Sequence, residues 1–393
     1  MSAPITEKHG EEGSNDYFEF GVSSMQGWRI DMEDAHLACV DAAASGDSIS
    51  GFYGVFDGHG GREVAKFCSR HMLEVWRSTK GLKDGKIADS LAEAYLSMDV
   101  LMRTESSYQE LQELSKKPER DEGLDGDDGG DADQMGVSQA QIKQLLMGIR
   151  QGLNNKNNGL GGGEDGSSGN MDADAIDTVI ETVTRGPGRD EVAARDRAHA
   201  GPTAGCTAVV AVIVKDEIVC ANAGDSRCVF SRNGRAVAMS RDHKPNDHDE
   251  AMRIHKAGGF VTDGRVNGSL NLSRALGDME YKQRTDLSPK EHAVTAFPEV
   301  FSCKLHKDDD FVILACDGIW DVMTNQEAVD FVRERIGKAP LQQICENICD
   351  YCLAPDTAGV GKGCDNMTVM VVKLKDPLVK NSDLFEDPKK VEV

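Results

Sequence analysis

The chain has 393 residues, with 44 basic and 67 acidic side chains and a formal net charge of −23. A chain this acidic is repelled by nucleic acid and by anionic membrane surfaces, so we expect neither as a partner. The longest apolar run, residues 208–214, is far shorter than the ~20 residues that a membrane-spanning helix needs. Eleven scattered cysteines, several of them in apolar runs, indicate buried thiols in a reducing compartment, the cytoplasm or the nucleus.

Residues 17–104 begin a folded region. Short apolar runs predict strands at 18–22, 35–40 and 51–56. Apolar side chains at helical spacing predict helices at 62–76 and 87–102. The polar, acidic residues 1–16 precede this region, and we expect them to form a flexible tail.

Residues 108–200 interrupt this pattern with an acidic, glycine-rich stretch. Runs such as Asp-Gly-Asp-Asp-Gly-Gly-Asp at 125–131 combine low hydrophobicity with net charge, which is typical of disorder. Two pieces, 138–153 and 172–183, have the spacing of short amphipathic helices. We interpret the stretch as a disordered insert within one domain that extends over 17–375, and not as a second domain.

Folding signals return after about residue 203. We predict strands at 207–214, 217–223, 311–316 and 367–372, and helices at 327–336 and 341–353. Asn233-Gly234 marks a hairpin turn. Strands that come in pairs, with helices interspersed, favour an α+β fold of antiparallel sheets covered by helices over a doubly wound parallel sheet. We expect residues 376–393 to form a second flexible tail and the protein to be a monomer.

Four aspartates stand at the ends of predicted strands: Asp57, Asp225, Asp317 and Asp365. Strands of one sandwich can bring such ends together, and hard divalent cations bind several oxygens from carboxylates and water. The four are therefore candidate metal ligands. Any one of them alone also fits a turn, since Asp-Gly is common in turns.

Three residues between the first two predicted strands are also candidates. Arg29 can bind a phosphate through paired hydrogen bonds, or it can form a surface ion pair with Asp31 or Glu33. Glu33 and Asp34 suit a position facing metal-bound water, or a solvated acidic turn. The residues alone leave these alternatives open.

His59 lies two residues after Asp57. It can protonate a leaving alkoxide as a general acid, or serve as a structural histidine in a turn. No cysteine is followed by arginine at the sixth position, so the loop of cysteine-dependent tyrosine phosphatases is absent from the sequence.

Eight motifs in order resemble the protein phosphatase 2C family, the metal-dependent PPM phosphatases. They cover about 17–104 and 203–375 and include Arg-Ile-Asp-Met-Glu-Asp at 29–34, Asp-Gly-His-Gly-Gly at 57–61, Gly-Asp-Ser-Arg at 224–227, Ser-Arg-Ala-Leu-Gly-Asp at 273–278, Asp-Gly-Ile-Trp-Asp at 317–321 and Cys-Asp-Asn at 364–366. The resemblance implies a four-layer α-β-β-α sandwich of two antiparallel sheets with helices on both outer faces.

The resemblance also implies a dinuclear metal site. Asp57 would bridge two Mn²⁺ or Mg²⁺ ions, and the Gly58 carbonyl would bind one of them. Asp317 and Asp365 would complete the other, and Glu33 would hold metal-bound water.

Further roles carry over from the family to matching positions. Asp225 and Asp321, with Asp317, match a weaker third metal site of some relatives. Arg29 would grip the substrate phosphate and His59 would act as general acid. A segment between 242 and 278 would include a flap beside the cleft.

The function implied is hydrolysis of phosphoserine and phosphothreonine in proteins. Two cations ~3.5–4 Å apart lower the pKa of water and neutralise charge developing on phosphorus, so attack is direct and in-line. The alternatives are an inactive member that serves as a binding scaffold, and a dinuclear phosphodiesterase or nuclease. A scaffold would normally lack metal aspartates, and the acidic net charge opposes nucleic-acid substrates. Our hypothesis for the insert is recruitment of basic substrates or partners.

Overall fold

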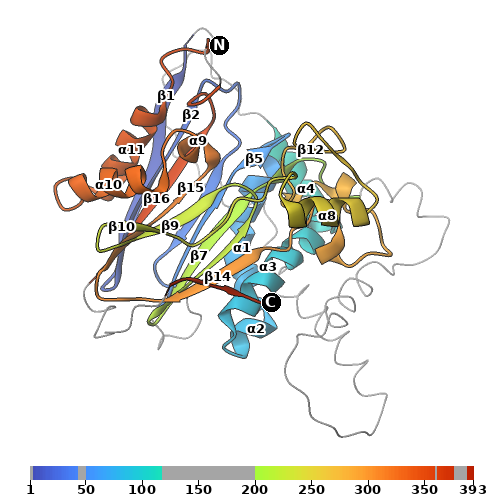
Figure 1. The fold of residues 1–393 in the computed structure, drawn as a ribbon, viewed down its shortest axis with the longest axis horizontal. Helices are drawn as coiled ribbons and strands as arrows, with labels where there is room; N and C mark the ends of the chain where they lie inside the picture. The colour runs from blue at the N-terminus through green and yellow to red at the C-terminus, as the bar shows by residue number, and fades with distance from the viewer. Residues whose placement is uncertain (1–2, 43–49, 117–199, 359–360, 376–386) are drawn as a thin grey trace, which may run out of the picture.

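The computed structural model describes residues 3–42, 50–116, 200–358, 361–375 and 387–393. Within these ranges two six-stranded antiparallel sheets pack face to face, and helices cover both outer faces (Figure 1). This arrangement confirms the predicted α+β sandwich. Among the described helices, none is long and apolar enough to cross a membrane.

The first sheet pairs strands from the beginning of the chain with strand β16 from near its end. Its strands in spatial order are β1 (Ile5–Ser14), β2 (Phe18–Gly27), β16 (Met367–Leu374), β15 (Asp309–Ala315), β9 (Arg227–Arg232) and β10 (Arg235–Ala238). Helices α10 (Asn325–Arg335) and α11 (Leu341–Cys352) cover its outer face (Figure 1). In α11 the buried side chains recur every three or four residues, so one helical face lies on β2 and β16.

The second sheet carries the helices of the N-terminal half. Its order is β17 (Lys389–Val391), β14 (Glu299–Lys304), β8 (Glu217–Ala223), β7 (Ala208–Val214), β4 (Ser50–Phe56) and β3 (Ala35–Cys39). Its helices are α1 (Glu63–Ser78), α2 (Lys80–Lys83), α3 (Ile87–Met102) and α4 (Glu105–Ser115). Strands β4 and β7 are buried almost throughout, because the other sheet covers one face and α1 and α3 cover the other.

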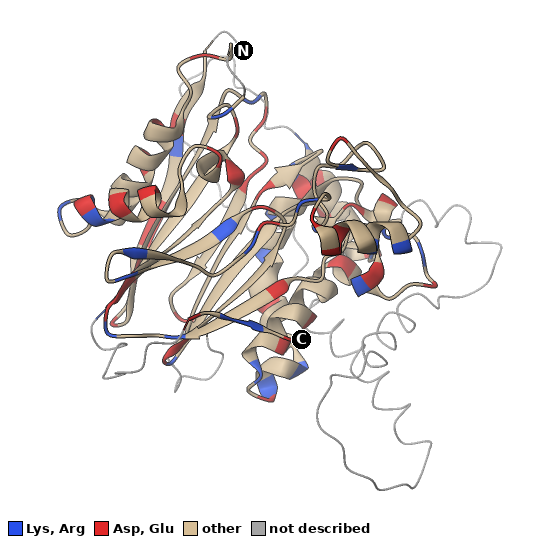
Figure 2. Ribbon diagram, viewed as in Figure 1, with Lys and Arg blue, Asp and Glu red and all other residues tan. Residues whose placement is uncertain are grey.

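The core between the sheets is apolar and contributed by both of them. Phe18, Tyr53, Phe230 and Val312 are fully buried in one cluster there. Figure 2 accordingly shows the central strands largely free of charged residues, which lie instead on helices and connecting loops. The packing therefore leaves the strand ends as the place where carboxylates can gather.

Three expectations about the domain limits need correction. Residues 5–14 form the edge strand β1, not a flexible tail, and residues 389–391 form β17 at an edge of the second sheet. Helix α4 extends to Ser115, beyond the expected start of the insert at 108. Strand β1 is mostly exposed and polar, so backbone pairing with β2 stabilises it and hydrophobic patterning does not reveal it. The helices expected at 138–153 and 172–183, and the disorder expected of the insert, lie outside the described residues.

A smaller unit is built beside one end of the sandwich. A three-stranded sheet orders β13 (Leu276–Gly277), β6 (Gly205–Cys206) and β5 (Gly58–His59). The adjoining residues 242–291, called the flap below, include the stretch where the resemblance implies one. They contain α8 (His248–Lys256), the hairpin of β11 (Val261–Thr262) and β12 (Arg265–Val266), and two short 3₁₀ helices, Met279–Tyr281 and Pro289–Glu291.

Glu250 anchors the flap from within. Its carboxylate is buried and accepts hydrogen bonds from Ser273 at 2.6 Å, Arg274 at 2.7 Å and Arg253 at 2.8 Å. Burial acts to raise the pKa of Glu250, but the two arginines outweigh it and the pKa is lowered. A buried and paired carboxylate thus links α8 to the segment at 273–274.

Candidate metal centre

The centre forms where strands of both sheets end. Asp57 follows β4, Asp317 opens the short helix α9 (Asp317–Trp320) after β15, and Asp365 lies two residues before β16. Burial raises the pKa of Asp57 well above its usual value, and the charges of Asp34, Asp317, Asp225 and Asp365 raise it further. The strand-end aspartates are therefore brought together, as the sequence predicted.

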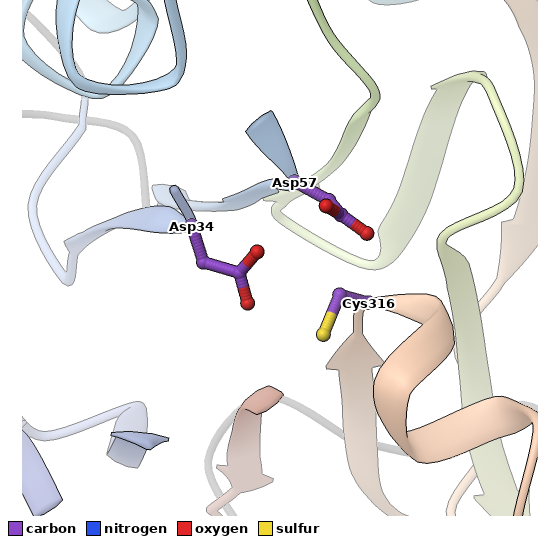
Figure 3. Close-up of side chains that lie close together, drawn as sticks. All are labelled: Asp34, Asp57 and Cys316. Carbon is purple, nitrogen blue, oxygen red and sulfur yellow. The ribbon is translucent and has the colours of Figure 1, made fainter. Parts of the chain in front are cut away.

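Asp34 lies beside Asp57. Ligand atoms of Asp34, Asp57 and Cys316 lie within 4.8 Å of one another (Figure 3). The Thr368 hydroxyl donates to Asp34 Oδ2 at 2.7 Å, while Oδ1 is buried without a well-formed hydrogen bond to a described residue. Burial raises the pKa of Asp34 to about 6. A buried, under-satisfied carboxylate oxygen among other carboxylates fits a hard divalent cation or its water.

Cys316 is a neighbour of this site that the sequence analysis did not single out. Its sulfur accepts a hydrogen bond from the Thr368 backbone N–H at 3.1 Å, and burial raises the pKa of its thiol well above the usual value. A protonated thiol is a poor ligand for Mg²⁺ or Mn²⁺, which prefer oxygen. Cys316 therefore forms part of the wall and leaves ligation to the carboxylates.

A second group of carboxylates surrounds Lys244. Its ammonium forms an ion pair with Asp225 and lies near Asp317 and Asp321. Burial and then the charges of Asp225 and Asp365 raise the pKa of Asp317 to about 8. Asp225, Asp317 and Asp321, which were expected to form a third metal site, therefore lie near one another. Sequence reasoning missed Lys244, which supplies positive charge to the same group.

Arg29 faces the centre and not its sequence neighbours. Its guanidinium forms an ion pair with Asp365, and its side chain remains 56% exposed. The alternative partner Asp31 instead pairs with Arg62 at 3.2 Å. Burial acts to lower the pKa of Arg29, but Asp365 outweighs this effect, so the group stays charged. An exposed cation beside the carboxylates suits a phosphate ligand.

Asn366 holds the loop that carries Arg29 and Glu33. Its Nδ2 donates to the carbonyls of Gln26 at 2.9 Å and Asp31 at 3.0 Å, and its Oδ1 accepts from the Glu33 N–H at 3.0 Å. Burial raises the pKa of Glu33, which is half-buried on this loop. The motif containing Asn366 was visible in the sequence, but its role as the anchor of a segment more than 300 residues away was not.

Two glycines after aspartates have steric reasons to be glycine. A Cβ at Gly58 would lie 2.4 Å from the Glu33 carbonyl oxygen, and one at Gly318 would lie 2.0 Å from that of Asn366. The Asp-Gly pairs therefore do more than form turns. They let the loop of Glu33 and the segment before β16 approach the aspartates closely.

His59 is held by a residue that the sequence analysis gave no role. Its Nε2 lies 2.7 Å from Oδ2 of Asp278, at the end of β13. Burial acts to lower the pKa of His59, but the hydrogen bond and charge of Asp278 reverse that effect and raise it. A histidine that keeps its proton beside a cluster of carboxylates can serve as an acid.

Comparisons with known proteins show which family the chain matches. A family model described as "Protein phosphatase 2C" matches residues 18–121 and 164–361. "Probable protein phosphatase 2C 58" from Oryza sativa subsp. japonica is 44% identical over 98% of this chain and 91% of its own length. "Protein phosphatase 1G" from Homo sapiens is 32% identical over 91% of this chain and 88% of its own length. A solved phosphatase structure from Toxoplasma gondii covers 98% of this chain and 99% of its own with a TM-score of 0.58 and 20% identity, which supports the fold alone.

We predict that the metal-free protein loses stability as pH rises from about 5 to about 8. Asp34, with a pKa raised to about 6, and Asp317, with a pKa raised to about 8, bind protons more tightly in the folded chain than in the unfolded one. Their stabilising contribution is present at low pH and is lost as pH passes these raised values. Urea unfolding in EDTA across this range measures the effect.

Asp57→Asn is the variant to compare with the unaltered chain in this experiment, because it removes one carboxylate from the cluster at nearly constant side-chain size. We expect it to raise the Tm of the metal-free protein at about pH 8 and to abolish the rise in Tm that Mn²⁺ gives the unaltered chain. If the unfolding stability of the metal-free protein did not change over this pH range, the raised pKa values of Asp34 and Asp317 would be wrong.

Proposed function

We propose a mechanism for this chain on one premise: it belongs to the protein phosphatase 2C family. The chain is a metal-dependent protein serine/threonine phosphatase, and its substrates are phosphoproteins. The observation that carries the mechanism is the half-buried Asp57 at the end of β4, which lies among the charges of four other aspartates. The scaffold alternative required lost aspartates, whereas Asp57, Asp317 and Asp365 are all at the centre.

The aspartates would hold two Mn²⁺ or Mg²⁺ ions. We assign Asp57 and the Gly58 carbonyl, with Asp317 and Asp365, to this pair of sites, and Asp225, Asp317 and Asp321 to a weaker third one. When bound, the cations supply positive charge to the phosphoryl group and lower the pKa of a water at the site. Support comes from the oxygen-rich donor set and from the under-satisfied Oδ1 of Asp34.

The other residues position the substrate and move protons. Arg29 binds phosphoryl oxygens, since its exposed guanidinium lies beside Asp365. Glu33 and Asp34 orient the attacking water through their carboxylates. His59 donates a proton to the serine or threonine oxygen as it leaves, and Asp278 supports its protonated form. Because water attacks the phosphorus directly, no side chain becomes phosphorylated in this mechanism.

Asp57→Asn should lower turnover of a phosphothreonine peptide by several orders of magnitude in Mn²⁺, because the carboxylate assigned to both cations loses its charge. Circular dichroism should remain that of the folded protein. The exposed Asp286→Asn provides the matched control and should retain activity. Near-normal Mn²⁺-dependent turnover by Asp57→Asn would remove Asp57 from the metal site.

His59→Ala should discriminate between leaving groups. General-acid catalysis contributes about 10²–10⁴-fold when the leaving group needs a proton, so the loss on a phosphoserine peptide should fall in that range. An aryl phosphate leaves as a stabilised phenolate, and its hydrolysis should fall much less. Similar losses of kcat on both substrates would rule out the acid role.

Basic phosphoproteins are the substrates that the charge favours. The chain carries a net charge of −23, and the acidic residues 117–199 lie outside the described structure. We expect kcat/KM for a Lys/Arg-rich phosphopeptide to fall with added salt more steeply than for an acidic peptide of equal length. Deleting 117–199 should flatten that salt dependence, and an unchanged salt dependence would exclude recruitment by the insert.

A further inference from the structure

We infer that Asp278 is a positioning residue that fixes the His59 imidazole for proton donation to the leaving group. The inference rests on the proposed role of His59 as general acid. It adds a carboxylate from the base of the flap to the reaction machinery, although Asp278 itself touches no reacting atom.

The contact between the two side chains is short and enclosed. His59 Nε2 lies 2.7 Å from Asp278 Oδ2, and the Asp278 side chain is only 4% exposed against 26% for His59. Among the described residues, Asp278 is the sole hydrogen-bond partner of this imidazole. One ring nitrogen is therefore tied to the protein, and Nδ1 remains for the substrate.

Gly205 makes the contact possible. It lies on β6 between His59 on β5 and Gly277 on β13, and it pairs with both. A Cβ at position 205 would lie 2.2 Å from Asp278 Oδ2 and 2.6 Å from His59 Nε2. Any side chain there would push the two groups apart, although φ at Gly205 is not in the left-handed region. The three-stranded sheet thus leaves a gap that the histidine–carboxylate pair fills.

The backbone of Asp278 is held in an uncommon conformation. Its φ is +50°, in the left-handed region that non-glycine residues rarely adopt. Its N–H donates to the Ala204 carbonyl at 2.9 Å, and its own carbonyl accepts from the Tyr281 N–H at 3.0 Å. Strain of this kind persists only where the surroundings enforce it, and it concentrates at functional sites.

A second carboxylate anchors the same segment to α3. Asp99 Oδ1 accepts from the Gly277 N–H at 2.9 Å, and Oδ2 accepts from the Lys282 ammonium at 2.6 Å. Lys282 also donates to the Ala275 carbonyl at 2.7 Å. The residues on both sides of Asp278 are therefore fixed to the scaffold, so its carboxylate meets His59 at a defined place.

The test compares substrates that differ in their need for a proton. Asp278→Ala should lower kcat about a hundredfold on a phosphoserine peptide, the scale of a misplaced catalytic group, and should hardly change hydrolysis of p-nitrophenyl phosphate. Asp278→Asn keeps an acceptor oxygen in place and should recover part of the loss. The exposed Asp286→Asn in the same flap is the matched control.

Gly205→Ala separates positioning from loss of charge, because both side chains remain. We expect it to give the same leaving-group dependence as Asp278→Ala, with an unchanged Mn²⁺-induced rise in Tm. In the His59→Ala background, Asp278→Ala should cause no additional loss of kcat, because residues acting through one group are not additive.

The outcomes are distinguishable. If His59→Ala shows the leaving-group dependence but Asp278→Ala and Gly205→Ala lose equally on both substrates, the positioning role is wrong and the acid role stands. Additive losses in the double variant would lead to the same conclusion. If His59→Ala itself shows no leaving-group dependence, the acid role and this inference both fall.

Discussion

Repulsion between buried carboxylates is the constraint on which the site depends. Asp57 is half-buried and lies among four other aspartates, an arrangement that is unfavourable in the metal-free chain because desolvation disfavours ionisation and like charges add to the cost. The sandwich core fixes the strand ends that carry these aspartates, and Asn366 fixes the loop of Glu33 beside them, despite this cost. The folded structure therefore holds like charges together, and bound cations would relieve their repulsion.

Two basic side chains form ion pairs with aspartates of this cluster. Arg29 pairs with Asp365 from the N-terminal loop, and Lys244 pairs with Asp225 from the start of the flap segment. Each basic side chain neutralises only part of the negative charge. The pKa of Asp57 is still raised in their presence, so the charge around Asp57 is not compensated. Arg29 also remains 56% exposed, as the phosphate-binding role that we propose for it requires.

The sequence revealed the parts of the site that follow from local pattern. Asp57 and Asp317 were visible because each follows a run of buried strand residues. Lys244 and Asp278 were given no role, because their partners lie far along the chain and only tertiary packing makes the contacts. The fold class followed from paired strands and helical periodicity, whereas β1 escaped because a polar edge strand carries no hydrophobic signal.

The edge position of β1 has a consequence for how this protein can be shortened. Strand β1 pairs along one side of β2, with Glu12 opposite Gly21 and Ser14 opposite Glu19. A chain trimmed at residue 16 would leave that row of amides and carbonyls open beside α11. Open rows of this kind can pair with strands from other molecules, so β1 covers an edge of β2 that would otherwise be available for such pairing.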